Sequence, residues 1–320
     1  MEKIFRPSYI WPNKSFPFRL YFDDKKLRIF IIENLQHNFS WIEQYRHKFR
    51  PTDFFIVILG CNYHEWLIKE ASKMFDALNL NRINFYILFN DERQKKAFIE
   101  NGFQGKIINQ NAWIDERSVM RPLNLKKVYK AIYVARLISL KRHSLCSSLE
   151  NLALVAGNSY RSNQLILDFP YDYLNKEQLT PYEVCTKINE SMCGLILSES
   201  EGACFASSEY LLCGIPVVST KSVGGRDVWY NTYNSRVVEP DPLLVKEAVD
   251  FFNENPRNSA QIRRSHIDQA TIYRNEFVIL LTKIFETYGI DNVDAREYFE
   301  TNFFHKMRLS FAPDFEAIFN

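Results

Sequence analysis

The chain has 320 residues, of which 46% are hydrophobic, 15% aromatic and 24% charged, and its formal net charge is +2. This composition excludes bulk disorder, and the near balance of acidic and basic groups is not typical of a nucleic-acid-binding protein. Only ten residues are glycine, where a chain of this length usually carries about 22, so collagen-like and linker-rich sequences are excluded as well.

Short apolar segments alternate with amphipathic segments from residue 26 onward. The predicted strands are 27–32, 54–59, 84–89 and 106–108, and the predicted helices are 40–49, 65–80 and 91–101. The segment FFIVIL at 54–59 is apolar at every position, which is typical of a strand buried on both faces of its sheet. Strands that alternate with helices predict a parallel, doubly wound sheet.

A second series of the same kind follows a basic connection at 117–127. Its predicted strands are 131–134, 152–155, 165–167, 194–197, 216–219 and 236–238, and its predicted helices are 142–148, 205–213, 242–253 and 259–288. The last 30 or so residues are rich in aromatic side chains with helical spacing. The sequence therefore predicts an N-terminal α/β domain over 1–125, a second α/β domain over 126–288, and a helical tail over 289–320 that packs back on the first domain.

Six cysteines are present, without the C-x-x-C spacing of a metal site. Most of them lie in apolar stretches, where free cysteine behaves as a small buried side chain. The first residues contain no apolar segment of signal-peptide length, and no apolar run approaches the ~20 residues of a membrane span. We expect a cytoplasmic protein with reduced thiols and no bound metal.

The segment 197–220, LSESEGACFASSEYLLCGIPVVST, carries the clearest chemical signal. A predicted strand ends in polar residues, Glu201 and Gly202 form a turn, and a helix begins near Phe205. The backbone N–H groups at such a helix start, together with the helix dipole, favour an anion. Ligands of open α/β sheets bind beyond the carboxyl ends of the strands, where this turn is expected.

Glu201 and Glu209 enclose the turn and the start of the helix. Eight residues of helix rise about 12 Å, so two carboxylates at this spacing match the two ends of a nucleotide sugar. Ionised carboxylates accept hydrogen bonds from the hydroxyls of sugar and ribose. Taken alone, two glutamates at this spacing are more often surface charges.

Other motifs in the same half of the chain support a ligand site. The segment 197–220 resembles the E-x7-E motif and following Gly-x-Pro-Val strand of the retaining nucleotide-sugar glycosyltransferases of the GT-B fold, especially glycosyltransferase family 4. Arg136 and Lys141, in ARLISLK, resemble the family's G-R-L-x-x-x-K segment. Gly157 resembles the end of its next strand, and 224–227, GGRD, resembles its G-G-x-x-E turn with Asp in place of Glu. The resemblance covers about residues 128–285.

The resemblance implies the GT-B fold: two Rossmann-like α/β domains, each with a doubly wound parallel sheet, face a cleft, and a helical tail follows. It implies that Arg136 and Lys141 hold the donor diphosphate, Glu201 the sugar hydroxyls and Glu209 the ribose. The implied donor site is completed by a set of turn and helix-start residues: Gly202, Ala203, Cys204, Phe205, Gly157 and Gly225. His64, after the strand 54–59, resembles a family histidine that reaches the donor sugar, although a histidine there is as readily a loop residue.

Two cations, a helix start and turn amides can stabilise a departing diphosphate without metal, and the chain has no Asp-x-Asp motif. The resemblance implies a retaining transferase that moves a sugar from a nucleoside-diphosphate sugar to a glycan or lipid-linked acceptor in bacterial surface-polysaccharide assembly. The aromatic and basic segment 41–50 and the aromatic tail could contact an anionic membrane, or they could pack on the first domain.

Two alternatives remain open. The first domain is short and lacks the family's glycine-rich N-terminal loop, which fits a non-catalytic GT-B paralogue that acts as a binding or accessory subunit. A GT-B-fold sugar-nucleotide isomerase would need acid–base groups for which His64 is the one histidine candidate.

Overall fold

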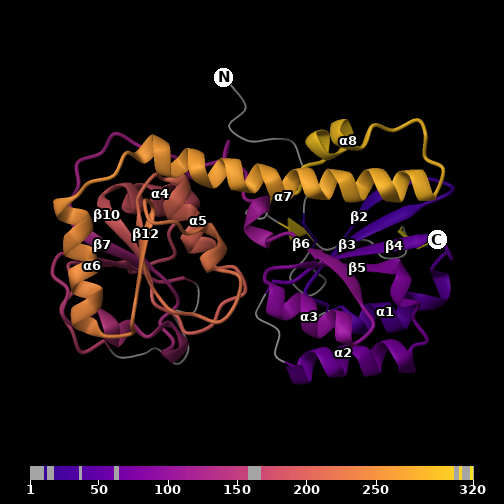
Figure 1. The fold of residues 1–320 in the computed structure, drawn as a ribbon, viewed down its shortest axis with the longest axis horizontal. Coiled ribbons are helices and arrows are strands. Elements are labelled where there is room, and N and C mark those ends of the chain that lie inside the picture. Colours follow the sequence, from indigo (N-terminus) through magenta and orange to yellow (C-terminus); the bar gives the residue numbers. More distant parts are fainter. Residues whose placement is uncertain are drawn as a thin grey trace. The chain divides into compact units, whose positions relative to one another are not determined.

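The computed structural model describes residues 11–12, 18–35, 38–60, 65–157, 167–305, 310–311 and 318–319. They form two compact units (Figure 1). The central unit consists of the described residues of 116–269, and the N-terminal unit consists of those of 11–115 and 270–319. The contacts thus divide the chain at 115/116 and again, within a helix, at 269/270, where the sequence places one boundary at 125/126 and another at 288/289.

The N-terminal unit is built on a five-stranded sheet. Its strands lie in the order β2 (Phe18–Asp23), β3 (Arg28–Glu33), β4 (Asp53–Ile58), β5 (Phe85–Phe89) and β6 (Gln104–Ile107). The strands β3 to β6 are parallel, as predicted. The sequence did not predict β2, which runs antiparallel to β3 at the edge of the sheet. A tight polar turn, in which Asp24 N donates to Leu27 O at 2.9 Å, joins β2 to β3.

Both faces of this sheet are covered by helices (Figure 1). The helices are α1 (Phe39–Tyr45), α2 (Glu65–Ala77), α3 (Glu92–Glu100), α7 (Ser259–Thr287) and α8 (Ala295–Thr301). Because side chains alternate along a strand, Ile29 and Ile31 of β3 pack with residues of α7 and α8, while Phe30 and Ile32 pack with residues of α1 to α3. Every residue of β4 is buried, which confirms the prediction made for 54–59.

The aromatic side chains that the structure describes in segment 41–50 and in the tail lie in or against these cores. Trp41 is 1% exposed and stacks on Phe18 with ring centroids 4.4 Å apart. In the tail, Phe304 packs against Trp113 at 4.5 Å. Both side chains are buried, as expected if these segments pack on the first domain. Among the described residues, no helix combines the length and apolarity that a membrane span requires.

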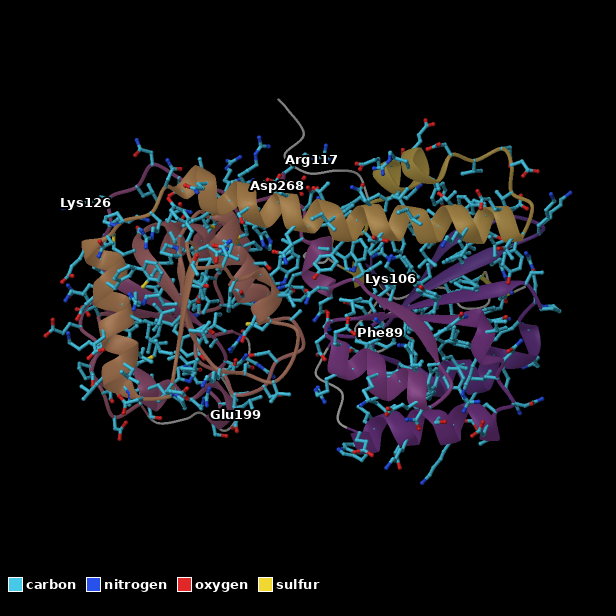
Figure 2. All side chains as sticks on the ribbon, in the orientation of Figure 1. Phe89, Lys106, Arg117, Lys126, Glu199 and Asp268 are labelled. Atoms are coloured by element: carbon cyan, nitrogen blue, oxygen red, sulfur yellow. The ribbon has the colours of Figure 1, made fainter. Side chains whose placement is uncertain are left out.

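The central unit has a six-stranded sheet in which all neighbours are parallel. Its order is β12 (Ser235–Val238), β11 (Val217–Thr220), β10 (Ser191–Ile196), β7 (Tyr129–Val134), β8 (Leu152–Val155) and β9 (Tyr173–Leu174). Helices α4 (Pro181–Asn189), α5 (Phe205–Leu212), α6 (Pro242–Glu254) and the first part of α7 accompany it. In both units side chains fill the space between sheet and helices (Figure 2).

The chain builds this sheet outward from β7 in two directions. It passes from β7 to β8 and β9 on one side, then returns to place β10 beside β7 and continues to β11 and β12 on the other. The strand order therefore reverses between β7 and β10. Such a switch point leaves a crevice at the carboxyl ends of the two strands, where open α/β sheets bind ligands.

Two predictions for this unit need correction or fall outside the structure. The predicted helix 142–148 is replaced by two short 3-10 turns, Ser139–Lys141 and His143–Cys146, because Arg142 between them has a left-handed backbone with φ +49°. The predicted strand 165–167 lies mostly outside the described residues, and Leu167 itself is not in a strand.

Candidate functional site

The loops that leave β7 and β10 carry three of the predicted site residues. Arg136 and Lys141 follow β7, and Glu201 follows β10. Because β7 and β10 flank the switch point of the sheet, these side chains lie at the place where the fold itself predicts a ligand.

Lys141 and Glu201 form an ion pair between Nζ and Oε1. Their side chains are 12% and 15% exposed, so the pair is largely shielded from water and stronger than a surface pair. Tyr133 supports the lysine turn, because its hydroxyl donates to Lys141 O at 2.6 Å. The family resemblance assigns Lys141 and Glu201 to different parts of a ligand, and the structure brings the two side chains into contact.

The loop after β10 is joined to the loop after β11 by backbone hydrogen bonds. Val223 N donates to Glu199 O at 2.9 Å, and Glu201 N donates to Val223 O at 3.0 Å. Gly225 N donates to Gly202 O at 2.7 Å, so two of the predicted turn glycines are in direct contact. Glu201 and Gly202 are thus held from the side of β11 as well as by their own strand.

Gly224 is required where these loops meet. Its φ is +122°, and a Cβ at this position would lie 1.6 Å from the carbonyl oxygen of Glu201. Only glycine allows this approach of two backbones, so the position of Glu201 depends on the absence of a side chain at residue 224.

Helix α5 begins directly after the turn. Cys204 is its N-cap residue, with φ +56° and a side chain that forms no capping hydrogen bond. This conformation is strained for a residue that has a Cβ. Ala203 is buried and Phe205 is 36% exposed. Burial, together with Glu201, raises the pKa of the Cys204 thiol to about 11, which keeps this thiol protonated at neutral pH.

Glu209 lies one turn further along α5 and is half-buried. No hydrogen-bond partner of its carboxylate occurs among the described residues. Burial raises the pKa of Glu209 from its usual value near 4.5 to about 7, and Cys185 adds to the shift. A carboxylate that is desolvated and still has its acceptor capacity is suited to bind hydroxyl groups.

Arg136 and Gly157 lie next to each other at the ends of β7 and β8. A Cβ on Gly157 would be 3.9 Å from Arg136 Cγ, and both residues are exposed. Arg136 forms no ion pair within the described part of the chain, so its guanidinium is available to an anion. It does not share the Lys141–Glu201 pair.

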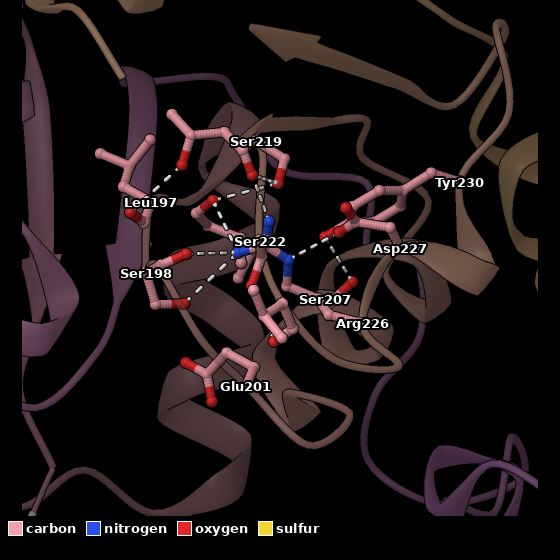
Figure 3. Close-up of polar contacts among 12 residues, drawn as sticks. Leu197, Ser198, Glu201, Ser207, Ser219, Ser222, Arg226, Asp227 and Tyr230 are labelled. Atoms are coloured by element: carbon pink, nitrogen blue, oxygen red, sulfur yellow. Dashed lines mark hydrogen bonds and ion pairs between the residues drawn. The ribbon is translucent and has the colours of Figure 1, made fainter. Parts of the chain in front are cut away.

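The sequence did not single out Arg142 or Arg226 as site residues. Arg226 is 0% exposed and binds the ends of both β10 and β11, with Asp227 as its counter-ion at 2.7 Å (Figure 3). Arg142 contacts the same two strand ends. Arg226 follows the GG pair of the predicted turn and Arg142 follows Lys141, but neither position shows from the sequence that its side chain turns inward.

Two further predictions concern a histidine and metal binding. His64 lies outside the described residues. Within the described ranges, no three His, Cys, Asp or Glu side chains gather in a metal-binding arrangement.

No protein-family model matches this sequence, and no curated protein matches it. Solved structures do match. TarM is 12% identical, with a TM-score of 0.56 over 79% of this chain and 54% of TarM, so the chain spans about half of that protein. Sucrose-phosphate synthase from Thermosynechococcus elongatus is 15% identical, with a TM-score of 0.58 over 80% of this chain and 74% of the synthase. HepE from Anabaena, in complex with UDP, is 13% identical, with a TM-score of 0.52 over 79% of this chain and 78% of HepE. Together with its two parallel-sheet α/β units, these similarities show that the chain has the GT-B fold of glycosyltransferases.

Proposed function

We propose that this protein is a retaining glycosyltransferase of the family 4 type that uses a nucleoside-diphosphate sugar. The single observation that supports the proposal most is the Lys141–Glu201 ion pair at the switch point of the central sheet. It places a cation for phosphate and a carboxylate for sugar hydroxyls where an α/β sheet binds its ligand.

Each residue of the site has a role in this reaction. Arg136 and Lys141 bind the diphosphate, and the amides of the turn and of the α5 start, from Gly202 to Phe205, add donors. Gly157 and Gly225 leave room for the phosphates. Glu201 accepts hydrogen bonds from the sugar, and Glu209 accepts them from the ribose.

The chemical step is a group transfer without metal. The bond between the anomeric carbon and the diphosphate oxygen breaks, and the acceptor hydroxyl forms its bond to that carbon on the same face. The acceptor proton passes to the departing phosphate oxygen, so no protein base is required. The cations stabilise the negative charge that grows on the leaving diphosphate.

The donor and acceptor classes are part of the proposal. HepE binds UDP in its structure, which makes a uridine nucleotide the first donor to test. The acceptor is a glycan or a lipid-linked glycan of bacterial surface-polysaccharide assembly, which rests on the family resemblance alone.

Calorimetry with UDP, GDP, ADP, CDP and dTDP tests the donor site. We expect one of these nucleotides to bind the wild-type protein, and we expect Lys141→Met to weaken that binding at least tenfold. Lys130→Met is the matched control, because Lys130 also pairs with a glutamate, Glu150, but at the start of β7. Absence of binding by all five nucleotides would refute the proposal and favour the non-catalytic paralogue.

A further inference from the structure

Two arginines, Arg142 and Arg226, contact the loops of the candidate site and have no part in the reaction proposed above. The loop after β10 carries Glu201 and Gly202, and the loop after β11 carries Gly225. The two loops are joined to each other by an isolated β-bridge between Ser200 and Val223 and by the hydrogen bond from Gly225 N to Gly202 O. Two arginines add side-chain contacts to the covalent connection of each loop with its strand.

Arg226 makes the first of these connections. Its Nη1 donates to Ser198 O at 2.9 Å, and its Nη2 donates to Thr220 O. Ser198 lies two residues beyond the end of β10, and Thr220 is the last residue of β11. One buried guanidinium thus ties both strand ends together, and Asp227 balances its charge (Figure 3).

Arg142 makes the second connection, from the lysine turn. Its Nε donates to Leu197 O at 2.6 Å, and its Nη2 donates to Thr220 Oγ1 at 2.7 Å. Since Arg142 directly follows Lys141 in a left-handed conformation, the same contact fixes the turn that presents Lys141. The loops after β7, β10 and β11 therefore meet at one pair of strand ends.

The two guanidiniums are close enough to influence each other. Burial lowers the pKa of Arg142, Glu199 opposes this change, and Arg226 adds to it. Burial lowers the pKa of Arg226 as well, but Tyr230 and Asp227 raise it by more than burial lowers it.

We propose that Arg142 and Arg226 are positioning residues, which hold the loops carrying Lys141, Glu201, Gly202 and Gly225 in the geometry that binds the donor diphosphate. This inference rests on the proposed glycosyltransferase function. Neither arginine touches the ligand: each acts through backbone and hydroxyl groups at the ends of β10 and β11. Because binding of a charged group depends on preorganised donors, small shifts of these loops weaken it strongly.

The test compares Arg142→Lys with Arg263→Lys. Lysine keeps the charge at residue 142 but cannot bind Leu197 and Thr220 in the same fork. Arg263 is a matched control, because it is also half-buried in the central unit and also binds backbone carbonyls, among them Met120 O at 2.9 Å. We expect Arg142→Lys to raise the Kd of the bound nucleoside diphosphate at least tenfold, and Arg263→Lys to leave it within twofold, at similar losses of Tm.

A double-mutant cycle separates positioning from direct contact. Thr220→Val removes the hydroxyl that accepts the hydrogen bond from Arg142 Nη2 and keeps the shape of the side chain. We expect it to weaken nucleotide binding in the wild type and to have little further effect in Arg142→Lys. Asp227→Asn loosens Arg226 without removing it, and we expect it to weaken binding in the same direction.

The outcomes distinguish this inference from the proposed function. If the wild type binds no nucleoside diphosphate, the proposed function fails first. If the wild type binds, and Arg142→Lys binds equally well or loses affinity only as much as Arg263→Lys, the positioning role is wrong. Additive losses in the cycle with Thr220→Val would also overturn it, because they would mean that Arg142 does not act through the hydroxyl of Thr220.

Discussion

Lys141 and Glu201 neutralise each other across the switch point of the central sheet. The pair joins the loop after β7 to the loop after β10, and it is 12–15% exposed. A diphosphate that binds Lys141 therefore competes with Glu201 for the same ammonium group, and a sugar that binds Glu201 compensates the carboxylate. In the proposed complex the diphosphate replaces Glu201 as the partner of Lys141, and the sugar hydroxyls replace Lys141 as the partner of Glu201. Binding of the two parts of the donor is therefore linked through this ion pair.

This relationship predicts strong coupling between the two residues. Lys141→Met and Glu201→Gln each leave one largely buried charged group without its partner, so each single variant loses stability. The double variant removes both charges and recovers part of the loss, with a coupling energy of about 1–3 kcal/mol. Urea unfolding of the wild type, both singles and the double measures this energy. Additive losses would mean that the ion pair contributes nothing to the folded state.

Activity should separate from stability in the same set of variants. Each single variant should lose at least 90% of sugar transfer, and the double variant should not recover it, because the diphosphate and the sugar each lose a ligand. Release of nucleoside diphosphate from the donor is the measurement. Transfer at the wild-type rate in either single variant would remove Lys141 and Glu201 from the mechanism.

Glu209 predicts a pH dependence of stability. Its pKa is raised by burial to about 7, from about 4.5 in the unfolded chain. Between these values the folded state binds more protons than the unfolded state, so the contribution of Glu209 to stability falls as the pH rises from about 4.5 to 7 and is constant above 7. Glu209→Gln removes this change. The difference in unfolding free energy between wild type and Glu209→Gln should therefore vary over this pH range and level off above it.

Nucleotide binding should respond to the same proton in the opposite sense. If Glu209 binds the ribose as a carboxylate, the nucleotide binds more tightly as the pH rises from 6 to 8. The terminal phosphate of the nucleotide also titrates near pH 6, but it does so equally for wild type and Glu209→Gln. Calorimetry at several pH values should show the steeper rise in affinity for the wild type. Parallel curves would place the ribose elsewhere.

The close approach at Gly224 predicts that adding one methyl group there strongly lowers stability or nucleotide binding. In Gly224→Ala the new Cβ would meet the carbonyl oxygen of Glu201, and the backbone at φ +122° would be strained. We expect a loss of at least about 3 kcal/mol of stability, or a displaced loop that no longer binds nucleotide. Gly157→Ala is the control, because among the described residues its Cβ would come near Arg136 Cγ alone, at 3.9 Å, and its stability should change by less than about 0.5 kcal/mol.

The sequence predicted those parts of the molecule that periodicity and caps determine locally. The apolar run in β4 and the alternation of strands with helices gave the parallel sheets, because burial on both faces demands apolar residues at every position. The strand β2 was missed, since its antiparallel pairing with β3 depends on a tertiary edge position. The predicted helix 142–148 was wrong because Arg142 adopts a left-handed backbone to reach two strand ends.

The candidate site divides in the same way. The pattern of strand, turn and helix located Glu201 and Gly202 after a strand end, and the resemblance to the GT-B family singled out Lys141; the sheet topology then brought the two loops together. Arg142 and Arg226 were not predicted, because nothing local distinguishes an arginine that turns into the protein from one that faces water. Their role is visible only from the carbonyls that they bind.

The backbone conformation of Cys204 predicts that glycine at the start of α5 gives a more stable protein than alanine. Its φ of +56° is strained for any side chain with a Cβ, at a cost of order 1–3 kcal/mol. Cys204→Gly and Cys204→Ala both remove the thiol, but only glycine removes the strain. Glycine also gives the unfolded chain more freedom, which costs roughly 0.5–1 kcal/mol, so we expect Cys204→Gly to be more stable than Cys204→Ala by about 1 kcal/mol. Thermal unfolding of the two variants measures the difference. An alanine variant as stable as the glycine variant would show that the backbone relaxes when the thiol is removed, and that the strain is imposed by the cysteine side chain and not by the turn that presents Glu201.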